Sequence, residues 1–225
     1  MNGGSKRGTS KTGQQQVRVW QRMLSGRRLD LVDPSPLDIE VEDIAHGLAR
    51  VARWNGQTLG DHAFSVAQHS LLVVDLVDAL TQDKASPDLR LAALLHDAAE
   101  YVIGDMISPF KGLLGDGYRT IEQRLSTAVH LRHQLPAALP KRFHDCIKKA
   151  DAVSAYLEAT QLAGFSTAEA DKVFGRPPGP LSGITLQPMP ATEAENRFLE
   201  QHRTLFTAHI FALTEKAAPA SGVSW

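Results

Sequence analysis

The feature that most constrains the fold of this chain is a histidine beside an aspartate inside an apolar run. The run reads LRLAALLHDAAEYVIGD, from Leu89 to Asp105, and the pair is His96-Asp97. Burying a carboxylate is costly unless a partner compensates its charge. A divalent cation is the partner that best suits a neutral imidazole next to a carboxylate. The pair therefore predicts a metal site on a helix of the protein core.

Other helices are expected to complete this site, because two or three ligands hold a metal poorly. On a continuous helix, His96 and Glu100 share one face, and Asp97 lies about 100° around the axis from His96. The best upstream donor is His69, within the apolar segment SVAQHSLLVV. The best downstream donor is Asp151, which apolar residues flank in KKADAVSAYLEA.

These four side chains form a set of two imidazoles and two carboxylates, namely His69, His96, Asp97 and Asp151. Mixed nitrogen and oxygen donors suit one divalent transition metal (Mn, Co, Fe, Ni or Zn) better than Ca²⁺, and Mg²⁺ stays a candidate. Two ordinary interpretations remain open. His69 could be a hydrogen-bonded core histidine, and Asp151 could be a surface acid paired with Lys148 or Lys149.

Hydrophobic periodicity and capping signals predict an all-α protein without strands. The expected helices cover residues 17–24, 40–54, 63–80, 88–102, 118–133, 141–163 and 192–215. Residues 1–15 have too little apolar content to fold and are expected to be a disordered tail, and residues 217–225 a frayed end. Between them, residues 16–216 are predicted to form a single domain.

Composition narrows the classes of partner. The formal net charge of −1 gives no global basic field, so stable nucleic-acid binding is not expected, although a local basic groove stays open. The apolar stretches are too short to span a bilayer, which takes about 20 residues. The N-terminus has no apolar run of signal-peptide length, so a cytoplasmic protein without membrane contact is expected. A homodimer is an open alternative to a monomer.

Short motifs between about residues 50 and 160 resemble a known superfamily. They are Arg53-Trp54, His69-Ser70-Leu71, Leu94-Leu95-His96-Asp97-Ala98-Ala99-Glu100, Gly104-Asp105, Pro109, Lys111, Ala150-Asp151-Ala152 and Ala155-Tyr156-Leu157. In this order the chain resembles the HD-domain metal-dependent phosphohydrolases, and within them the bacterial 5′-deoxynucleotidases and their bacterial and phage relatives. The resemblance implies an HD-domain helical bundle with a mononuclear metal site.

The resemblance also implies which residues carry out the chemistry. Glu100 would position or deprotonate the attacking water, and Asp105 would orient that water or protonate the leaving oxygen. Ordinary interpretations are a solvated glutamate at a helix end and an aspartate in a surface turn. The expected reaction is phosphomonoester hydrolysis of (deoxy)nucleoside 5′-monophosphates by a metal-activated water.

Three further residues are expected at the substrate. Arg53 would bind the phosphate with its planar guanidinium, and Lys111 would make a second phosphate contact. Trp54 would stack on the sugar and disfavour a 2′-hydroxyl. The alternative for Arg53 is a surface arginine at the C-terminal end of a helix, and the alternative for Trp54 is ordinary core packing of its indole.

Departures from the pattern exclude several branches of the superfamily. Tyr101 stands where the guanosine-polyphosphate hydrolases have a second acid, no HDxxH motif occurs, and Arg119 follows Gly117-Tyr118 in place of proline. A hydrolase for nucleoside triphosphates or another small phosphate, and a non-catalytic HD regulatory module, remain as alternatives. A nuclease or RNA-binding protein is disfavoured, because charge is near neutral and no aromatic–basic patch is visible in the sequence.

Overall fold

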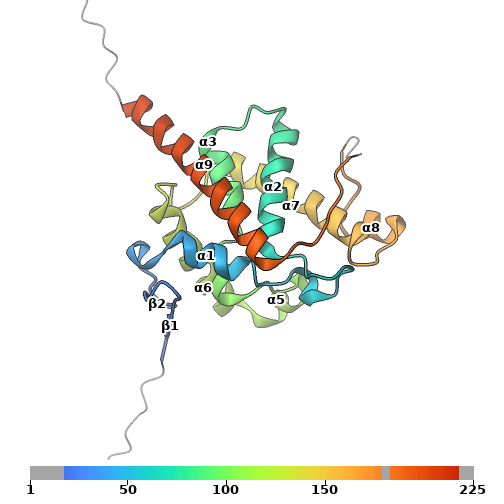
Figure 1. Ribbon diagram of the computed structural model, residues 1–225, viewed down its shortest axis with the longest axis horizontal. Coiled ribbons are helices and arrows are strands. Elements are labelled where there is room, and N and C mark those ends of the chain that lie inside the picture. Colours follow the sequence, from blue (N-terminus) through green and yellow to red (C-terminus); the bar gives the residue numbers. More distant parts are fainter. Residues whose placement is uncertain (1–17, 179–182, 218–225) are drawn as a thin grey trace, which may run out of the picture.

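The protein is described here by a computed structural model, which covers residues 18–178 and 183–217. Helices dominate these residues, as predicted, and surround a central helix (Figure 1). The elements are β1 (Trp20–Arg22), β2 (Arg28–Asp30), the 3-10 helix η1 (Pro36–Asp38), α1 (Val41–Leu48), the 3-10 helix η2 (Arg53–Gly56), α2 (Val66–Thr81), α3 (Pro87–Leu94), α4 (Glu100–Ile103), α5 (Ser108–Leu114), α6 (Asp116–Arg132), α7 (Lys141–Gln161), α8 (Thr167–Val173) and α9 (Ala191–Ala217). The tails expected at residues 1–15 and 217–225 lie outside the described residues, apart from Ala217, which ends α9.

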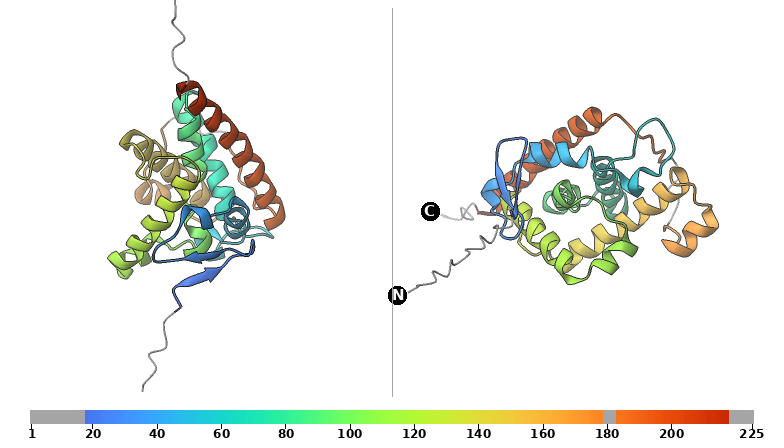
Figure 2. Two further views of the ribbon diagram at one scale, coloured as in Figure 1. Left: turned by 90° about the vertical axis from the view of Figure 1, so that its left-hand side faces the viewer. Right: turned by 90° about the horizontal axis from the view of Figure 1, so that it is seen from below.

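Helix α2 is the centre of the packing, because apolar side chains surround nearly its whole circumference. It packs against α3, α7 and α9, and α9 crosses the bundle along α1 and α3 (Figures 1 and 2). Its apolar residues from Val66 to Val77 are almost entirely buried. Burial of each such side chain contributes about 1.5–3 kcal/mol to stability. The first turn of α2, which carries His69, is therefore held rigidly inside the bundle.

The helix expected over residues 17–24 is wrong, because this segment forms a β-hairpin. Trp20 pairs with Asp30 and Arg22 with Arg28 in an antiparallel ladder, and Gly26 at φ 90° makes the turn. Leu29 is fully buried on the inner face of the hairpin. Alternation of inward and outward side chains therefore overrides the weak helical period of a short segment.

The single helix expected over residues 88–102 is also wrong. Helix α3 ends at Leu94, and α4 begins only at Glu100, so His96 and Asp97 lie in a turn between two helices. The imidazole Nδ1 of His96 donates to the carbonyl of Ala93 at 2.7 Å. This side-chain contact satisfies a carbonyl at the end of α3, which a continuing helix would have used for itself. The apolar period continues across the break, so no sequence signal indicates that the helix ends here.

Smaller differences concern helix ends and two short helices. The helix expected over residues 40–54 ends at Leu48, and η2 follows it as a separate turn. Helices α5 and α8 were not predicted. The latter begins with a capping box between Ser166 and Glu169, a signal that the sequence contained.

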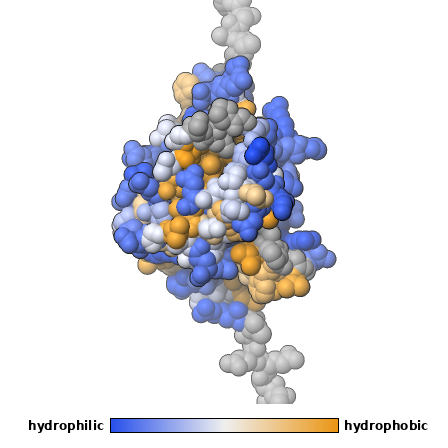
Figure 3. Space-filling view, turned by 90° about the vertical axis from the view of Figure 1, so that its right-hand side faces the viewer, coloured by the Kyte–Doolittle hydropathy of each residue, from blue (hydrophilic) through white to orange (hydrophobic). Residues whose placement is uncertain are grey.

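The surface of the molecule carries no broad apolar face in the view of Figure 3, where apolar patches alternate with hydrophilic side chains. Within residues 18–178 and 183–217, no helix combines the length and the apolarity needed to cross a bilayer.

Four buried histidines join the C-terminal end of α6 to α9. The rings of His133 and His202 lie 5.0 Å apart, and both residues are less than a tenth exposed. Burial lowers the pKa of each of these two imidazoles to about 4 and also lowers the pKa of His130. The fourth histidine is His209, which is 2% exposed, and all four are core side chains.

We expect this histidine cluster to make the fold sensitive to acid. An exposed imidazole in the unfolded chain has a pKa of about 6.5, so the unfolded state binds more protons once the pH falls below that value. Stability is therefore fully present above pH 6.5 and is lost as the pH falls toward 4, by roughly 3 kcal/mol at most for each ring. Urea unfolding of wild type and His202→Phe at pH 7.5 and 5 measures the difference. The variant should lose less stability on acidification than wild type, whereas His144→Gln, at an exposed position on α7, should lose as much. Equal losses in wild type and His202→Phe would contradict the assignment.

Candidate metal centre

The four predicted metal ligands lie around the Nε2 atom of His69. This atom is 3.2 Å from His96 Nε2, 3.4 Å from Asp97 Oδ2 and 3.3 Å from Asp151 Oδ1. His96 Nε2 and Asp97 Oδ2 are themselves 3.2 Å apart. Helix α2, the turn before α4 and helix α7 thus each bring donors to one point. His69, His96 and Asp97 form the tightest group, and Asp151 joins it from the side of His69.

The hydrogen bonds of the two imidazoles engage their Nδ1 atoms and leave their Nε2 atoms available to a metal ion. His69 Nδ1 donates to Glu158 Oε1 at 2.6 Å, and His96 Nδ1 donates to the Ala93 carbonyl. A neutral imidazole that donates through Nδ1 has an unprotonated Nε2. Two such nitrogens and two carboxylate oxygens, all 3.2–3.4 Å from one another or from His69, repel unless a cation lies between them. Ligands about 2.0–2.2 Å from one metal have about this spacing, so the donor set fits a divalent transition metal.

The charges around His69 favour a cation at the same place. Burial and the nearby Arg53 act to lower the pKa of this imidazole. The carboxylates of Glu158, Asp151 and Asp97 outweigh them and hold its pKa well above the usual value. A site that attracts a proton this strongly also attracts a metal ion, which competes with the proton for Nε2.

Glu158 is the residue that connects the metal ligands to the predicted substrate residues. Its Oε1 accepts from His69 Nδ1 and from the Ser154 hydroxyl, at 2.6 and 2.8 Å. Its Oε2 accepts from Trp54 Nε1 at 2.8 Å and from Arg53 Nε at 3.2 Å. The side chain is completely buried. Burial acts to raise its pKa, but His69 and Arg53 bring that pKa down to about 2, so the group is a carboxylate with four donors.

Arg53 and Trp54 lie in η2, next to the start of α2. An isolated bridge joins Ala52 to Ser65, and the N–H of Arg53 donates to the Phe64 carbonyl at 2.8 Å. Trp54 has φ 57°, a left-handed conformation that is an outlier for a bulky residue. Such strain persists where surrounding contacts enforce it, and here the hydrogen bond to Glu158 and the ring of Phe165, 5.7 Å away, do so.

The guanidinium of Arg53 is held between two carboxylates. Besides the contact with Glu158, its Nη1 donates to Asp105 Oδ2 at 2.9 Å, and the side chain is 14% exposed. Burial raises the pKa of Asp105, and Arg53 opposes that change. A guanidinium has five N–H donors, so this arrangement leaves others for a ligand. The structure therefore brings Arg53 and Asp105 together as one unit.

Glu100 lies beneath the metal centre and is only 3% exposed. Its Oε1 is 3.4 Å from Lys111 Nζ, while its Oε2 is buried without a hydrogen-bond partner among the described residues. Burial, with the nearby charges of Asp97 and Asp105, raises the pKa of this carboxyl to about 9. An orphaned buried carboxyl oxygen indicates that a ligand, a water or a cation completes its surroundings. Lys111 itself is shared between Glu100 and Glu122, the latter at 3.0 Å.

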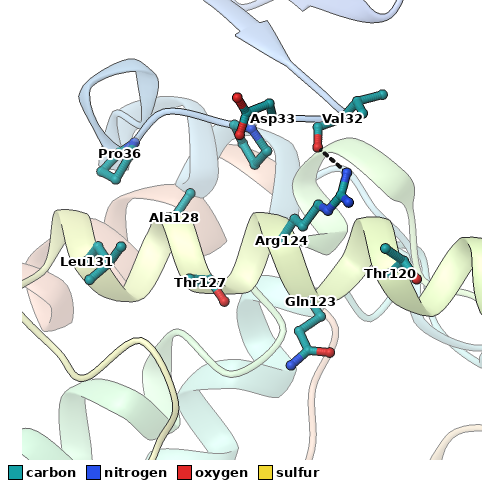
Figure 4. A pocket seen from close by; sticks show the side chains of 10 residues that line it. Val32, Asp33, Pro36, Thr120, Gln123, Arg124, Thr127, Ala128 and Leu131 are labelled. Carbon is teal, nitrogen blue, oxygen red and sulfur yellow. Dashed lines mark hydrogen bonds between the residues drawn. The ribbon is translucent and has the colours of Figure 1, made fainter.

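A cavity of about 420 Å³ opens onto this centre. Its lining includes His96, Asp97 and Glu100 on one side and residues of α6 on the other, among them Arg119 and Gln123. A volume of this size accommodates a small ligand. A larger cavity of about 630 Å³ lies against a neighbouring face of α6 and the loop from Val32 to Pro36 (Figure 4). It contains none of the predicted site residues.

The positions of Asp151, His96 and Asp97 differ from some of the sequence predictions. In the part of the chain that the structure describes, Asp151 forms no ion pair with Lys148 or Lys149 and contacts His69 instead. The continuous-helix geometry given for His96, Asp97 and Glu100 does not hold, since a turn carries the first two. Sequence reasoning missed Glu158. A signal existed, because Asp151, Ser154 and Glu158 follow an i, i+3, i+7 spacing that aligns them on one face of α7.

Comparisons with known proteins agree with this geometry. The family described as 5′-deoxynucleotidase YfbR-like matches residues 44–164, a range that contains every residue of the candidate site. An uncharacterised protein of Rhodobacter capsulatus is 58% identical over 193 residues, which are 84% of this chain and 96% of that protein. The uncharacterised protein YfdR of Escherichia coli is 32% identical over 112 residues, 49% of this chain and 57% of that protein.

Proposed function

The chain belongs to the YfbR-like family of 5′-deoxynucleotidase-like proteins, and from this premise we propose that it hydrolyses the phosphomonoester of (deoxy)nucleoside 5′-monophosphates. The family implies a metal-dependent hydrolase of the HD type. The observation that carries the proposal is the juxtaposition, around His69, of a cation-binding donor set with a guanidinium and a buried carboxyl. Phosphoryl transfer needs these three elements together.

We assign the metal to His69, His96, Asp97 and Asp151. When bound, a divalent cation would lower the pKa of a coordinated water and neutralise charge on the phosphoryl oxygens. The protein itself prepares the ligand geometry. Nδ1 hydrogen bonds fix both imidazoles in the tautomer that presents Nε2, so the donors are organised before any ligand arrives.

Glu100 is proposed as the group that exchanges a proton with the attacking water. Its Oε2 has no partner among the described residues and is close enough to the ligand turn to face the cavity at His96 and Asp97. The raised pKa shows that this environment disfavours a second negative charge beside Asp97. A divalent cation bound beside Asp97 would offset this repulsion and lower the pKa of Glu100, so that the carboxyl would be ionised and able to take a proton as a general base.

Arg53 is proposed to bind the phosphate, and Asp105 to orient the guanidinium and pass a proton to the leaving oxygen. Glu158 and Asp105 fix two edges of the guanidinium, so its free N–H groups have a defined direction. Trp54, fixed by the same Glu158, is proposed to limit the space at the sugar C2′ position. Arg119, which lines the cavity, and Lys111, which contacts Glu100, would add positive charge near the metal centre. A cytoplasmic location stays part of the proposal.

The test is phosphate release from a panel of nucleoside mono- and triphosphates, deoxy and ribo, with added Mn²⁺, Co²⁺ or Mg²⁺. We expect one phosphate per molecule from deoxynucleoside 5′-monophosphates and little from triphosphates. His96→Ala should lose metal, measured by elemental analysis, and turnover together. Unchanged metal content in that variant would remove His96 from the ligand set. Release of phosphate or pyrophosphate from triphosphates alone would replace the monophosphatase with the triphosphate alternative.

A further inference from the structure

A cluster of arginines around a tryptophan covers the outer face of the β-hairpin. The guanidinium carbons of Arg18, Arg22 and Arg28 lie 4.9, 5.6 and 4.4 Å from the centre of the Trp20 ring. The inner face is defined by Leu29, which is fully buried. Because side chains alternate along a strand, residues 18, 20 and 22 share the outer face with Arg28, the ladder partner of Arg22. The hairpin face thus presents three cations and one indole to solvent.

The hairpin carries one acidic side chain, Asp30, against these three arginines. None of the three forms an ion pair within the described ranges, whereas Arg27 on the same hairpin is paired with Glu40. Asp30 is the ladder partner of Trp20 and lies on the same face, near enough to Arg28 for their charges to interact, and its Oδ1 accepts from the backbone N–H groups of Val32 and Asp33. Like charges gathered around one ring repel one another, so the arrangement favours an anionic ligand.

The distribution of charge along the chain points the same way. Residues 1–29 contain seven lysines and arginines and no aspartate or glutamate, although the whole chain has a net charge of −1. The near-neutral total therefore conceals a basic N-terminal segment and an acidic remainder. Such an uneven distribution of charge is typical of a segment that binds a polyanion.

We propose that the hairpin face binds single-stranded nucleic acid, with phosphates held by Arg18, Arg22 and Arg28 and a base stacked against the Trp20 indole or a guanidinium. Planar cationic and aromatic groups in one strip suit a polymer that alternates phosphates with planar bases. This inference replaces the expectation drawn from net charge and from the apparent lack of an aromatic–basic patch. The expected helix over residues 17–24 hid this patch, because only in the hairpin do Arg18, Trp20 and Arg22 share one face and does the turn at Gly26 bring Arg28 beside Arg22.

The surface next to the hairpin extends this strip toward α6. The cavity of Figure 4 begins at Val32, two residues beyond β2, and continues over Arg124 and Thr127. Gln123 lines both this cavity and the smaller one at the metal centre.

The experiment measures fluorescence anisotropy of labelled 12-nucleotide DNA and RNA strands with the full chain, over a series of salt concentrations. We expect binding that weakens steeply with salt. Trp20→Ala should weaken it about 5- to 100-fold at fixed salt, and Trp20→Phe should weaken it less. Replacing Arg18, Arg22 and Arg28 by Gln should make the slope of log K against log salt shallower by about 0.7 for each residue.

Controls separate the hairpin from general charge. Arg142→Gln removes an arginine that lies over an aromatic ring on α7, 5.3 Å from Phe143, and should leave the affinity unchanged. All variants should keep the phosphatase activity of wild type, because the hairpin contributes nothing to the metal centre. Circular dichroism and activity therefore report whether each variant is folded.

Four results would overturn the proposal. The first is absence of oligonucleotide binding at low salt. The second is binding that Trp20→Ala leaves unchanged, which would assign it to the basic residues before the hairpin. The third is equal affinity for inorganic polyphosphate of matched charge, which would show that bases are not contacted. The fourth is hairpin-dependent binding to phosphatidylserine vesicles without binding to oligonucleotides.

Discussion

Glu100→Gln should lower turnover by about 10²- to 10⁴-fold while the protein still binds its metal. The substitution keeps the size of a side chain that is 3% exposed and removes its ability to take up a proton. The partnerless Oε2 and the pKa of about 9 both place this carboxyl where a charge is uncompensated. The measurement is kcat on the best nucleotide of the panel, with metal content determined on the same preparation.

Glu122→Gln is the matched control for this experiment. Glu122 is the other carboxylate that contacts Lys111, at 3.0 Å, so its substitution disturbs the same lysine without touching Glu100. Its kcat should stay within a few fold of wild type. If Glu100→Gln lost the metal, Glu100 would be a ligand and not the proton-transfer group. If both variants lost activity equally, the effect would belong to Lys111.

The sequence predicted the helical bundle, and which buried polar side chains meet in it, better than it predicted local geometry. Helices α2, α6, α7 and α9 were placed within a few residues, because each is long and its apolar period is sustained. The break at residues 95–99 could not be foreseen, since it depends on a hydrogen bond from His96 to the Ala93 carbonyl. The four residues predicted as metal ligands nevertheless meet in the structure, because burial of polar groups in apolar segments requires a partner wherever the helix ends.

What the sequence could not reveal depends on contacts between distant segments. Arg53 and Glu158 are 105 residues apart, and Arg28 meets Trp20 only because the chain turns at Gly26. In isolation, Glu158 is one charged residue on a long helix, and the usual interpretation is exposure to solvent. Its complete burial beneath three predicted site residues is a property of the packing of α7 against α2.

Glu158→Gln should impair metal binding and substrate binding together. The amide can accept on one side only, so one of two donor pairs, His69 with Ser154 or Trp54 with Arg53, would face an N–H group. Loss of the carboxylate also frees His69 to adopt the tautomer with a protonated Nε2. Removal of such a partner typically lowers metal affinity or activity by about 10- to 100-fold.

The variants and readouts can distinguish a positioning role from simple destabilisation. We expect Glu158→Gln to raise both the dissociation constant of the metal, measured by titration calorimetry, and KM at saturating metal. Ser154→Ala removes one donor to Oε1 and should show a smaller loss of metal affinity with KM unchanged, because Oε2 still holds Arg53 and Trp54. Glu195→Gln breaks a partly exposed ion pair with Arg50 and should change neither quantity.

The result that would contradict this role is a loss confined to thermal stability. If metal affinity and KM of the folded Glu158→Gln protein matched wild type, the four hydrogen bonds would be structural only. A raised KM with unchanged metal affinity would limit Glu158 to Arg53 and Trp54. The expected combination requires one carboxylate to set the direction of an imidazole, a guanidinium and an indole at once. The four hydrogen bonds that the two oxygens of Glu158 accept give it contacts to all three of these groups.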